Sequence, residues 1–208
     1  MSLWSGLRVR WQAFKTRRKM NRQFGRREDP FSYGLFPYEK ARLDAMQAAL
    51  SGRRWSRVLE AGCAEGHFTE RLVQLADRVT ALDISAVALG RARRRVTAAE
   101  FHETDLLTWS PPAEQLYDAI VLGDVLYYLD RPGVAAEFEA LFPRVTSWLK
   151  PGGRLLLAHG FGGGTELAHR RHFRERFEAA GLALVREAPV EGAELGGVRC
   201  LLSVLESR

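Results

Sequence analysis

Cysteines and long apolar runs are scarce in this sequence. Two cysteines occur among 208 residues, Cys63 and Cys200, and they fit neither a disulfide framework nor a metal-ligand spacing. The apolar runs stay far below the roughly 20 residues that a membrane-spanning helix needs. The N-terminus also lacks the unbroken apolar segment of a signal peptide. These absences predict a cytoplasmic, metal-independent protein without a membrane-spanning helix.

Acidic side chains are absent from the first 27 residues, which hold nine lysines and arginines. The other residues hold 22 basic and 25 acidic side chains, so their net charge is −3. The net charge of +6 and the pI of about 9.7 therefore belong to an N-terminal arm and not to the globular body.

Four apolar residues of this arm, Trp4, Leu7, Trp11 and Phe14, recur at spacings of three and four. This spacing predicts a helix with one aromatic face surrounded by arginines. Three interpretations are open. The face packs on its own domain or on a second copy, residues 1–24 lie on an anionic membrane surface or contact an acidic polymer, or the arm is disordered. Nucleic acid is not favoured as a partner, because a basic arm alone does not establish such binding.

Beyond the arm, apolar strand patterns alternate with helical ones. The predicted strands cover residues 57–60, 79–83, 100–103, 117–122, 154–159, 182–186 and 198–205. The predicted helices cover residues 37–50, 65–75, 85–96, 134–148 and 169–180. This order predicts an α/β fold with a doubly wound, mostly parallel sheet covered by helices on both faces. We divide the chain into a basic arm (1–27), a lid and helix (28–54) and a domain (55–208).

Two carboxylates stand at the ends of the first two strands. In residues 58–66 an apolar run ends in Glu60 and a glycine turn follows, and the next apolar run ends in Asp83. Ligands of such sheets bind at the carboxyl ends of the strands, where the strand order switches. We therefore expect Glu60 and Asp83 beside a small-molecule site.

The chemistry of these acids favours a ligand that has a ribose and a cationic group. The turn reads Gly-x-x-x-Gly and lacks the Gly-x-Gly-x-x-Gly fingerprint of dinucleotide sites, and Glu60 would repel a pyrophosphate. Asp83 can accept both hydroxyl groups of a ribose, and Asp105 can accept a hydrogen bond from an adenine amino group. S-adenosylmethionine offers a ribose, an ammonium and a sulfonium without any phosphate. The alternative is that Glu60 and Asp105 only cap helix N-termini.

Five segments, at residues 58–66, 79–83, 103–107, 117–130 and 149–157, resemble successive motifs of the class I S-adenosylmethionine-dependent methyltransferases. The resemblance extends over residues 55–206. It implies the Rossmann-like fold of that class, a sheet of about seven strands with one antiparallel strand in its edge region. More narrowly, GCAEGHFTERL, GDVLYYLD and FPYEKAR are similar to the nodulation protein S-like (NodS-like) group. That group implies N-methylation of an amino sugar in a chito-oligosaccharide.

The resemblance also implies roles for single residues. The residues that would contact the methionine end of the cofactor are Glu60, Gly62, Ala64 and Gly66, with Ala64 where many members have glycine. The residues that would hold ribose and adenine are Asp83, Ile84, Asp105 and Leu106. Asp124, at the tip of the strand at 117–122, would face the methyl group. The chain lacks, at that point, the Asn-Pro-Pro-Tyr sequence that is usual in enzymes that methylate adenine or cytosine in DNA, so this activity is not expected.

Methyl transfer asks for positioning more than for covalent help, and an amine must be neutral before it attacks. Asp124 is our first candidate for orienting the acceptor, and His159 is the second. The alternatives are a turn cap for Asp124 and a hydrogen-bonded strand end for His159. We expect one of Tyr127 and Tyr128 to be buried and the other to face the site.

Two further segments are candidates for controlling access. Residues 28–34 are expected to fold over the cofactor, with Tyr33 and Tyr38 as lid residues, and the glycine-rich residues 161–165 form a flap or a joint.

The predicted function is methylation of a small-molecule or glycan-like acceptor at nitrogen. The alternatives are a peripheral membrane methyltransferase acting on a lipid or lipid-linked sugar, and a non-catalytic S-adenosylmethionine-binding module. The sequence does not fix the oligomeric state.

Overall fold

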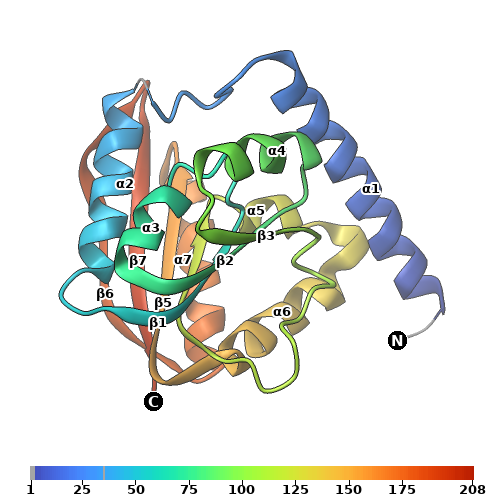
Figure 1. The fold of residues 1–208 in the computed structure, drawn as a ribbon. Helices are drawn as coiled ribbons and strands as arrows, with labels where there is room; N and C mark the ends of the chain where they lie inside the picture. The colour runs from blue at the N-terminus through green and yellow to red at the C-terminus, as the bar shows by residue number, and fades with distance from the viewer. Residues whose placement is uncertain (1–2, 35) are drawn as a thin grey trace.

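The computed structural model describes residues 3–34 and 36–208 (Figure 1). The strands are β1 (Trp55–Ala61), β2 (Ala76–Asp83), β3 (Ala99–Glu103), β4 (Tyr117–Gly123), β5 (Leu149–Phe161), β6 (Leu182–Leu195) and β7 (Val198–Ser207). The helices are α1 (Leu3–Arg26), α2 (Pro37–Leu50), α3 (Thr69–Leu75), α4 (Ala86–Arg95), α5 (Leu126–Leu129), α6 (Ala135–Ser147), α7 (Gly164–Ala179) and the short 3₁₀ helix η1 (Pro132–Val134).

The seven strands form a single sheet in the order β3-β2-β1-β4-β5-β7-β6. β7 runs antiparallel to β5 and β6, whereas the pairs among β1 to β5 are parallel. The predicted fold class, with one antiparallel strand near an edge, is confirmed. The strand order reverses between β1 and β4, so a ligand crevice opens at the carboxyl ends of these two strands.

Several boundaries differ from the sequence prediction. The helix expected at 65–75 begins only at Thr69, because turns after the glycine loop occupy the preceding residues. The late strands are longer than predicted, and their register shifts between Pro189 and Glu194. Helix α5 was not predicted. Gly164 and Thr165, expected in a glycine-rich flap or joint, form the first turn of α7.

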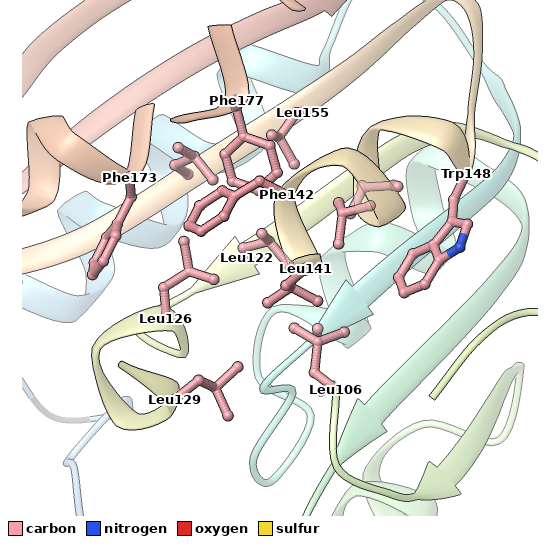
Figure 2. Packing of buried hydrophobic residues seen from close by; sticks show 14 of the residues in the cluster. Leu106, Leu122, Leu126, Leu129, Leu141, Phe142, Trp148, Leu155, Phe173 and Phe177 are labelled. Carbon is pink, nitrogen blue, oxygen red and sulfur yellow. The ribbon is translucent and has the colours of Figure 1, made fainter. Parts of the chain in front are cut away.

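The central strands are apolar on both faces because helices cover both sides of the sheet. Leu122 of β4 and Leu155 of β5 face a cluster that includes the rings of Phe142 and Phe177 from α6 and α7 (Figure 2). Val121, one residue before Leu122, points to the opposite face and packs in the cluster beneath α2. This two-sided burial fixes the register of β4, and therefore fixes where its carboxyl end lies.

The basic arm forms α1, which packs against α4 and η1 (Figure 1). Its buried stripe consists of Val9, Met20 and Phe24. Of the predicted aromatic face, Leu7, Trp11 and Phe14 are exposed, and the Trp4 side chain lies outside the described residues. The arm therefore packs on its own domain, but through a different stripe from the predicted one. The division of the chain at residues 27 and 54 stays a prediction. No helix within residues 3–34 and 36–208 is long and apolar enough to cross a membrane.

Candidate functional site

A cavity that is partly open to solvent lies at the carboxyl ends of β1, β2 and β4. The sequence-predicted residues that line it are Gly62, Ala64, Asp83, Ile84, Asp105, Leu106 and Asp124. The wall is completed by α1 and the following segment through Thr16, Met20, Phe24, Phe31 and Tyr33. The structure thus brings together most of the predicted cofactor residues.

The glycine loop after β1 has a left-handed backbone at Gly62 (φ 82°) and at Ala64 (φ 48°). A Cβ on Gly62 would lie 3.1 Å from Cβ of Val125 and 3.2 Å from the Gly123 carbonyl oxygen, so the tight turn needs glycine there. Gly66 does not line the cavity. Its Cα packs against Ala92 of α4, which a Cβ would approach to 3.2 Å. Gly66 therefore packs against helix α4, and the cofactor contact implied for it stays a prediction.

Asp83 ties this loop to the start of α4. Its Oδ2 accepts a hydrogen bond from the Ala64 backbone N–H at 2.9 Å, and its Oδ1 accepts one from the Ser85 N–H at 2.8 Å. Burial raises the pKa of the Asp83 carboxyl, and these backbone donors oppose that rise. A carboxylate offers about four lone-pair sites, so acceptor capacity toward the cavity remains.

Asp105 lines the cavity beyond β3, beside Leu106. Its Oδ1 accepts a hydrogen bond from the Leu107 N–H at 2.9 Å. One oxygen therefore holds a local turn. No helix of the described residues begins directly after Asp105, so the alternative of a helix N-cap at this residue is wrong. Burial raises the pKa of this carboxyl as well.

Glu60 does not line the main cavity. It lines a small neighbouring cavity, and the two cavities share Tyr33, Gly62 and Gly123. The Thr69 hydroxyl donates a hydrogen bond to Glu60 Oε2 at 2.6 Å. Burial is the largest influence on this carboxyl and raises its pKa to about 7. Glu60 thus lies next to the main cavity and not in its wall.

Asp124, at the end of β4, has a left-handed backbone (φ 49°) that turns its side chain toward β5 and α2. Its Oδ1 accepts a hydrogen bond from the Gly160 N–H at 2.8 Å. Its Oδ2 lies 3.1 Å from Nη1 of Arg42, and Nε of Arg42 donates to Oε2 of Glu39 at 2.8 Å. Asp124 is therefore held by partners from two other elements and does not merely cap its own turn.

Glu39 is buried and lines the cavity, but the sequence analysis did not single it out. Burial raises the pKa of its carboxyl, while the Arg42 guanidinium lowers it. Both residues stand in FPYEKAR, a segment that entered the sequence analysis only through the resemblance. The pairing of the acid and base three residues apart was the available signal.

Aromatic rings form one wall of the cavity. Tyr127 and Tyr128 both line it, with ring centroids 4.6 Å apart, so the expectation that only one of them faces the site was wrong. Tyr33, a predicted lid residue, also lines the cavity and stacks on His67 at 5.1 Å. Tyr38 packs in the core beneath α2 instead.

His159 is buried behind Tyr127 and does not line the cavity. Its ring centroid lies 6.1 Å from that of Tyr127 and 5.6 Å from that of Phe173. Burial lowers the pKa of the imidazole to about 4. Its Nε2 has no hydrogen-bond partner among residues 3–34 and 36–208. The structure does not bring His159 to the other site residues, and its catalytic role stays a prediction.

A family model for nodulation protein S (NodS) matches residues 15–164, which is most of the chain. The chain belongs to the NodS family. This confirms the predicted resemblance. The match begins at residue 15, so the exposed Leu7, Trp11 and Phe14 precede the part of the chain that the NodS family model describes.

Individual relatives agree with the NodS assignment. Nodulation protein S of Sinorhizobium fredii is 31% identical over 168 residues, which cover 79% of this chain and 74% of that protein. Nodulation protein S of Rhizobium tropici is 33% identical over 133 residues, covering 62% of this chain and 54% of that protein. For the Azorhizobium caulinodans protein the identity is 36% over 49% of each chain. The chain thus aligns with about half the length of the last two relatives.

Solved structures share the fold. The N-methyltransferase NodS from Bradyrhizobium japonicum WM9, in complex with S-adenosyl-L-homocysteine, has a TM-score of 0.75 and is 27% identical. The alignment covers 92% of this chain and 98% of that one. Magnesium protoporphyrin IX methyltransferase from Synechocystis, at 16% identity and a TM-score of 0.67, shares only the fold.

Proposed function

We propose that this chain is an S-adenosylmethionine-dependent methyltransferase that methylates an amine of a small or glycan-like acceptor. The predicted enzyme class and cofactor are confirmed at the level of the family. The observation that carries the choice of acceptor is the charge of the cavity. Its described lining includes four carboxylates, those of Glu39, Asp83, Asp105 and Asp124, and no lysine, arginine or histidine.

The residues present fit this cofactor. Asp83 would accept hydrogen bonds from the ribose hydroxyls, and Asp105 would accept one from the adenine amino group. Ile84 and Leu106, which also line the cavity, would supply apolar contacts for adenine. Gly62 would let the ligand approach the backbone, and Glu60, in the neighbouring cavity, would offer a carboxylate to the ammonium end. The described lining of the main cavity holds no lysine, arginine or histidine for a phosphate-bearing nucleotide.

When bound, the cofactor supplies a methyl group that its sulfonium already activates. The protein must then position a neutral amine in line with that methyl group, and positioning can contribute roughly 7–11 kcal/mol. We assign the orienting role to Asp124, because Arg42 and the Gly160 N–H hold its carboxylate in place. We assign proton acceptance to Glu39, because its buried carboxyl lines the cavity and burial raises the pKa of that carboxyl.

An amino sugar suits the rest of the cavity. The rings of Phe31, Tyr33, Tyr127 and Tyr128 offer apolar walls against which a sugar ring or a cation can lie. A carboxylate acceptor is disfavoured. The trans-aconitate 2-methyltransferase of Paracidovorax citrulli is 35% identical over 49% of this chain. A polycarboxylate would meet four carboxylates here, of which Arg42 pairs with two, those of Glu39 and Asp124.

Release of S-adenosylhomocysteine from S-adenosylmethionine tests the proposal. We expect turnover with a chito-oligosaccharide that carries a free amine, and none with its fully N-acetylated form or with trans-aconitate. Turnover on trans-aconitate alone would reject the amine assignment. Absence of S-adenosylhomocysteine binding in calorimetry would reject the cofactor assignment.

A matched pair of variants tests the role of Glu39. Glu39→Gln keeps the shape of the side chain and an acceptor for Arg42 but cannot take a proton. We expect kcat to fall by about 10²–10⁴, with little change in cofactor affinity. Glu191→Gln, an exposed position on β6, is the control and should leave kcat unchanged. Equal kcat values in both variants would exclude Glu39 as the proton acceptor.

A further inference from the structure

The outward side of α1 carries an amphipathic face that nothing in the described structure covers. This outer face consists of Leu7, Trp11, Phe14, Arg18 and Arg22, which follow one another at spacings of three and four. We propose that the outer face of α1 docks on an anionic lipid bilayer and brings the cavity wall formed by α1 to the membrane surface.

The apolar part of the outer face is exposed to a degree that packing on the domain does not explain. The exposed fractions are 58% for Leu7, 61% for Trp11 and 50% for Phe14. Trp11 and Phe14 stack on each other with ring centroids 5.7 Å apart and an interplanar angle of 19°. Tryptophan and phenylalanine on one side of a helix, with cations beside them, are typical of helices that lie in the membrane interface.

Basic residues continue and flank this apolar part. A shallow surface groove contains both kinds of residue. Its lining includes Trp11 and Phe14 and the basic residues Lys15, Arg18, Lys19, Arg22, Arg26 and Arg27. Within residues 3–34 and 36–208, the first five of these cations have no carboxylate at ion-pair distance. Such a cluster complements the negative potential of an anionic leaflet.

The distribution of charge selects a bilayer over the other occupants. A second copy of the chain would bring two sets of unpaired cations together, and like charges across an interface are costly. A polyanion such as nucleic acid would satisfy the cations, but it would leave Leu7 and the paired rings of Trp11 and Phe14 in water. A bilayer surface satisfies both parts, because headgroups meet the cations while the acyl boundary receives the apolar side chains.

The helix connects this face to the active site. Thr16, Met20 and Phe24, on the inner side of α1, line the cavity. Lys19 belongs to the basic groove, and its ammonium lies 5.8 Å from the ring centroid of Tyr128, which lines the cavity. Docking would therefore place headgroups beside helix α1, which forms part of the cavity wall. This geometry favours an amine acceptor that is carried by a lipid or held at the membrane, an inference that rests on the proposed function.

Vesicle co-sedimentation of the full chain tests the proposal. We expect the protein to pellet with vesicles of phosphatidylcholine and phosphatidylglycerol, and to stay in the supernatant with phosphatidylcholine alone. Trp11→Ser/Phe14→Ser should lower the partition coefficient at least about tenfold. Leu184→Ser/Val185→Ser, which removes exposed apolar side chains from the far edge of the sheet, should leave it unchanged.

Three results would overturn the docking proposal. They are equal pelleting with and without anionic lipid, equal pelleting of the two double variants, and a wild-type dimer in solution that Trp11→Ser/Phe14→Ser dissociates without affecting vesicle binding. Calorimetry with S-adenosylhomocysteine verifies that each variant is folded. Turnover on a soluble amine separates the two proposals, because lost vesicle binding with retained turnover rejects docking alone. Retained vesicle binding without any turnover rejects the proposed function alone.

Discussion

Nη1 of Arg42 lies 3.1 Å from Oδ2 of Asp124, and this contact joins helix α2 to the end of strand β4. The same guanidinium holds Glu39 through its Nε at 2.8 Å. One buried cation therefore positions both carboxylates that we assign to the acceptor side of the cavity. The geometry of the site depends on the two ion pairs of Arg42 as well as on the glycine loop, although Arg42 itself does not line the main cavity.

Replacing Arg42 is expected to destabilise the fold. Arg42→Met leaves two largely buried carboxylates without their partner, and breaking such a buried pair costs roughly 3–5 kcal/mol in the free energy of unfolding. Urea denaturation measures the loss. Lys40→Met, which removes the exposed ion pair between Lys40 and Asp44, should cost less than about 0.5 kcal/mol. Equal losses in the two variants would show that the Arg42 pair contributes no more than a surface pair.

Asp83 is expected to control cofactor affinity. Asp83→Asn replaces an acceptor oxygen with an NH₂ donor, so one of the hydrogen bonds from Ala64 and Ser85 is lost together with the charge-assisted contact to ribose. Hydrogen bonds to charged groups contribute roughly 1.5–3 kcal/mol, which corresponds to a 10- to 100-fold weaker Kd for S-adenosylhomocysteine. Asp77→Asn, at the exposed start of the same strand, serves as the control. A Kd that stays the same in Asp83→Asn would contradict the assignment of Asp83.

A pair of glycine variants separates backbone strain from crowding. Gly62 (φ 82°) and Gly52 (φ 94°) both have positive φ, and forcing an L-residue there costs roughly 1–2 kcal/mol. A Cβ at Gly52 meets nothing within 4 Å, whereas one at Gly62 lies 3.1 Å from Val125. Thermal unfolding should therefore show a larger loss for Gly62→Ala than for Gly52→Ala. The reverse order would mean that Val125 moves away freely.

Stability should depend on pH through Glu60. Burial raises the pKa of this carboxyl from 4.5 to about 7 in the folded state. Between these values the folded chain binds more protons than the unfolded chain, so the contribution is complete below about pH 4.5 and declines as the pH rises through 7. The full loss amounts to roughly 3 kcal/mol. Urea denaturation between pH 5 and 8 should show a flatter profile for Glu60→Gln, and parallel profiles would refute this origin.

His159 is expected to be dispensable for catalysis. His159→Leu exchanges a buried, neutral imidazole, whose Nε2 has no described partner, for an apolar side chain. A buried polar group without a partner costs roughly 1–3 kcal/mol of desolvation, and the variant no longer has this cost. The variant should therefore be at least as stable as the wild type. Its kcat should stay within a few fold, whereas a loss as large as that of Glu39→Gln would restore His159 as a catalytic candidate.

The fold was predictable because its information is local. Continuous apolar runs such as 119–122 and 155–158 mark strands that are buried on both faces, and the strand-end acids Glu60 and Asp83 mark the crevice. The site was only partly predictable. Whether His159 or Glu39 reaches the cavity depends on how α2 and β5 pack against each other, and such long-range packing leaves no periodic signal in the sequence.

Helix α1 illustrates the same limit in another way. Its aromatic spacing correctly indicated one apolar side, but Val9, Met20 and Phe24 form a second apolar stripe, and this stripe packs on the domain. A helical pattern reports that a face exists and does not report which neighbour the face meets. Only the tertiary structure distinguishes the inner stripe from the outer one.

The two stripes of α1 also have a thermodynamic consequence. Met20 and Phe24 form part of the wall of the cavity, while Trp11 and Phe14 point outward from the same rigid helix. A partner that binds the outer face of α1 and shifts this helix relative to the domain therefore changes the affinity of the cavity for its ligand. By thermodynamic linkage, the ligand in the cavity then changes the affinity of the outer face for its partner by the same factor. A single helix thereby makes the chain capable of heterotropic coupling without a second domain.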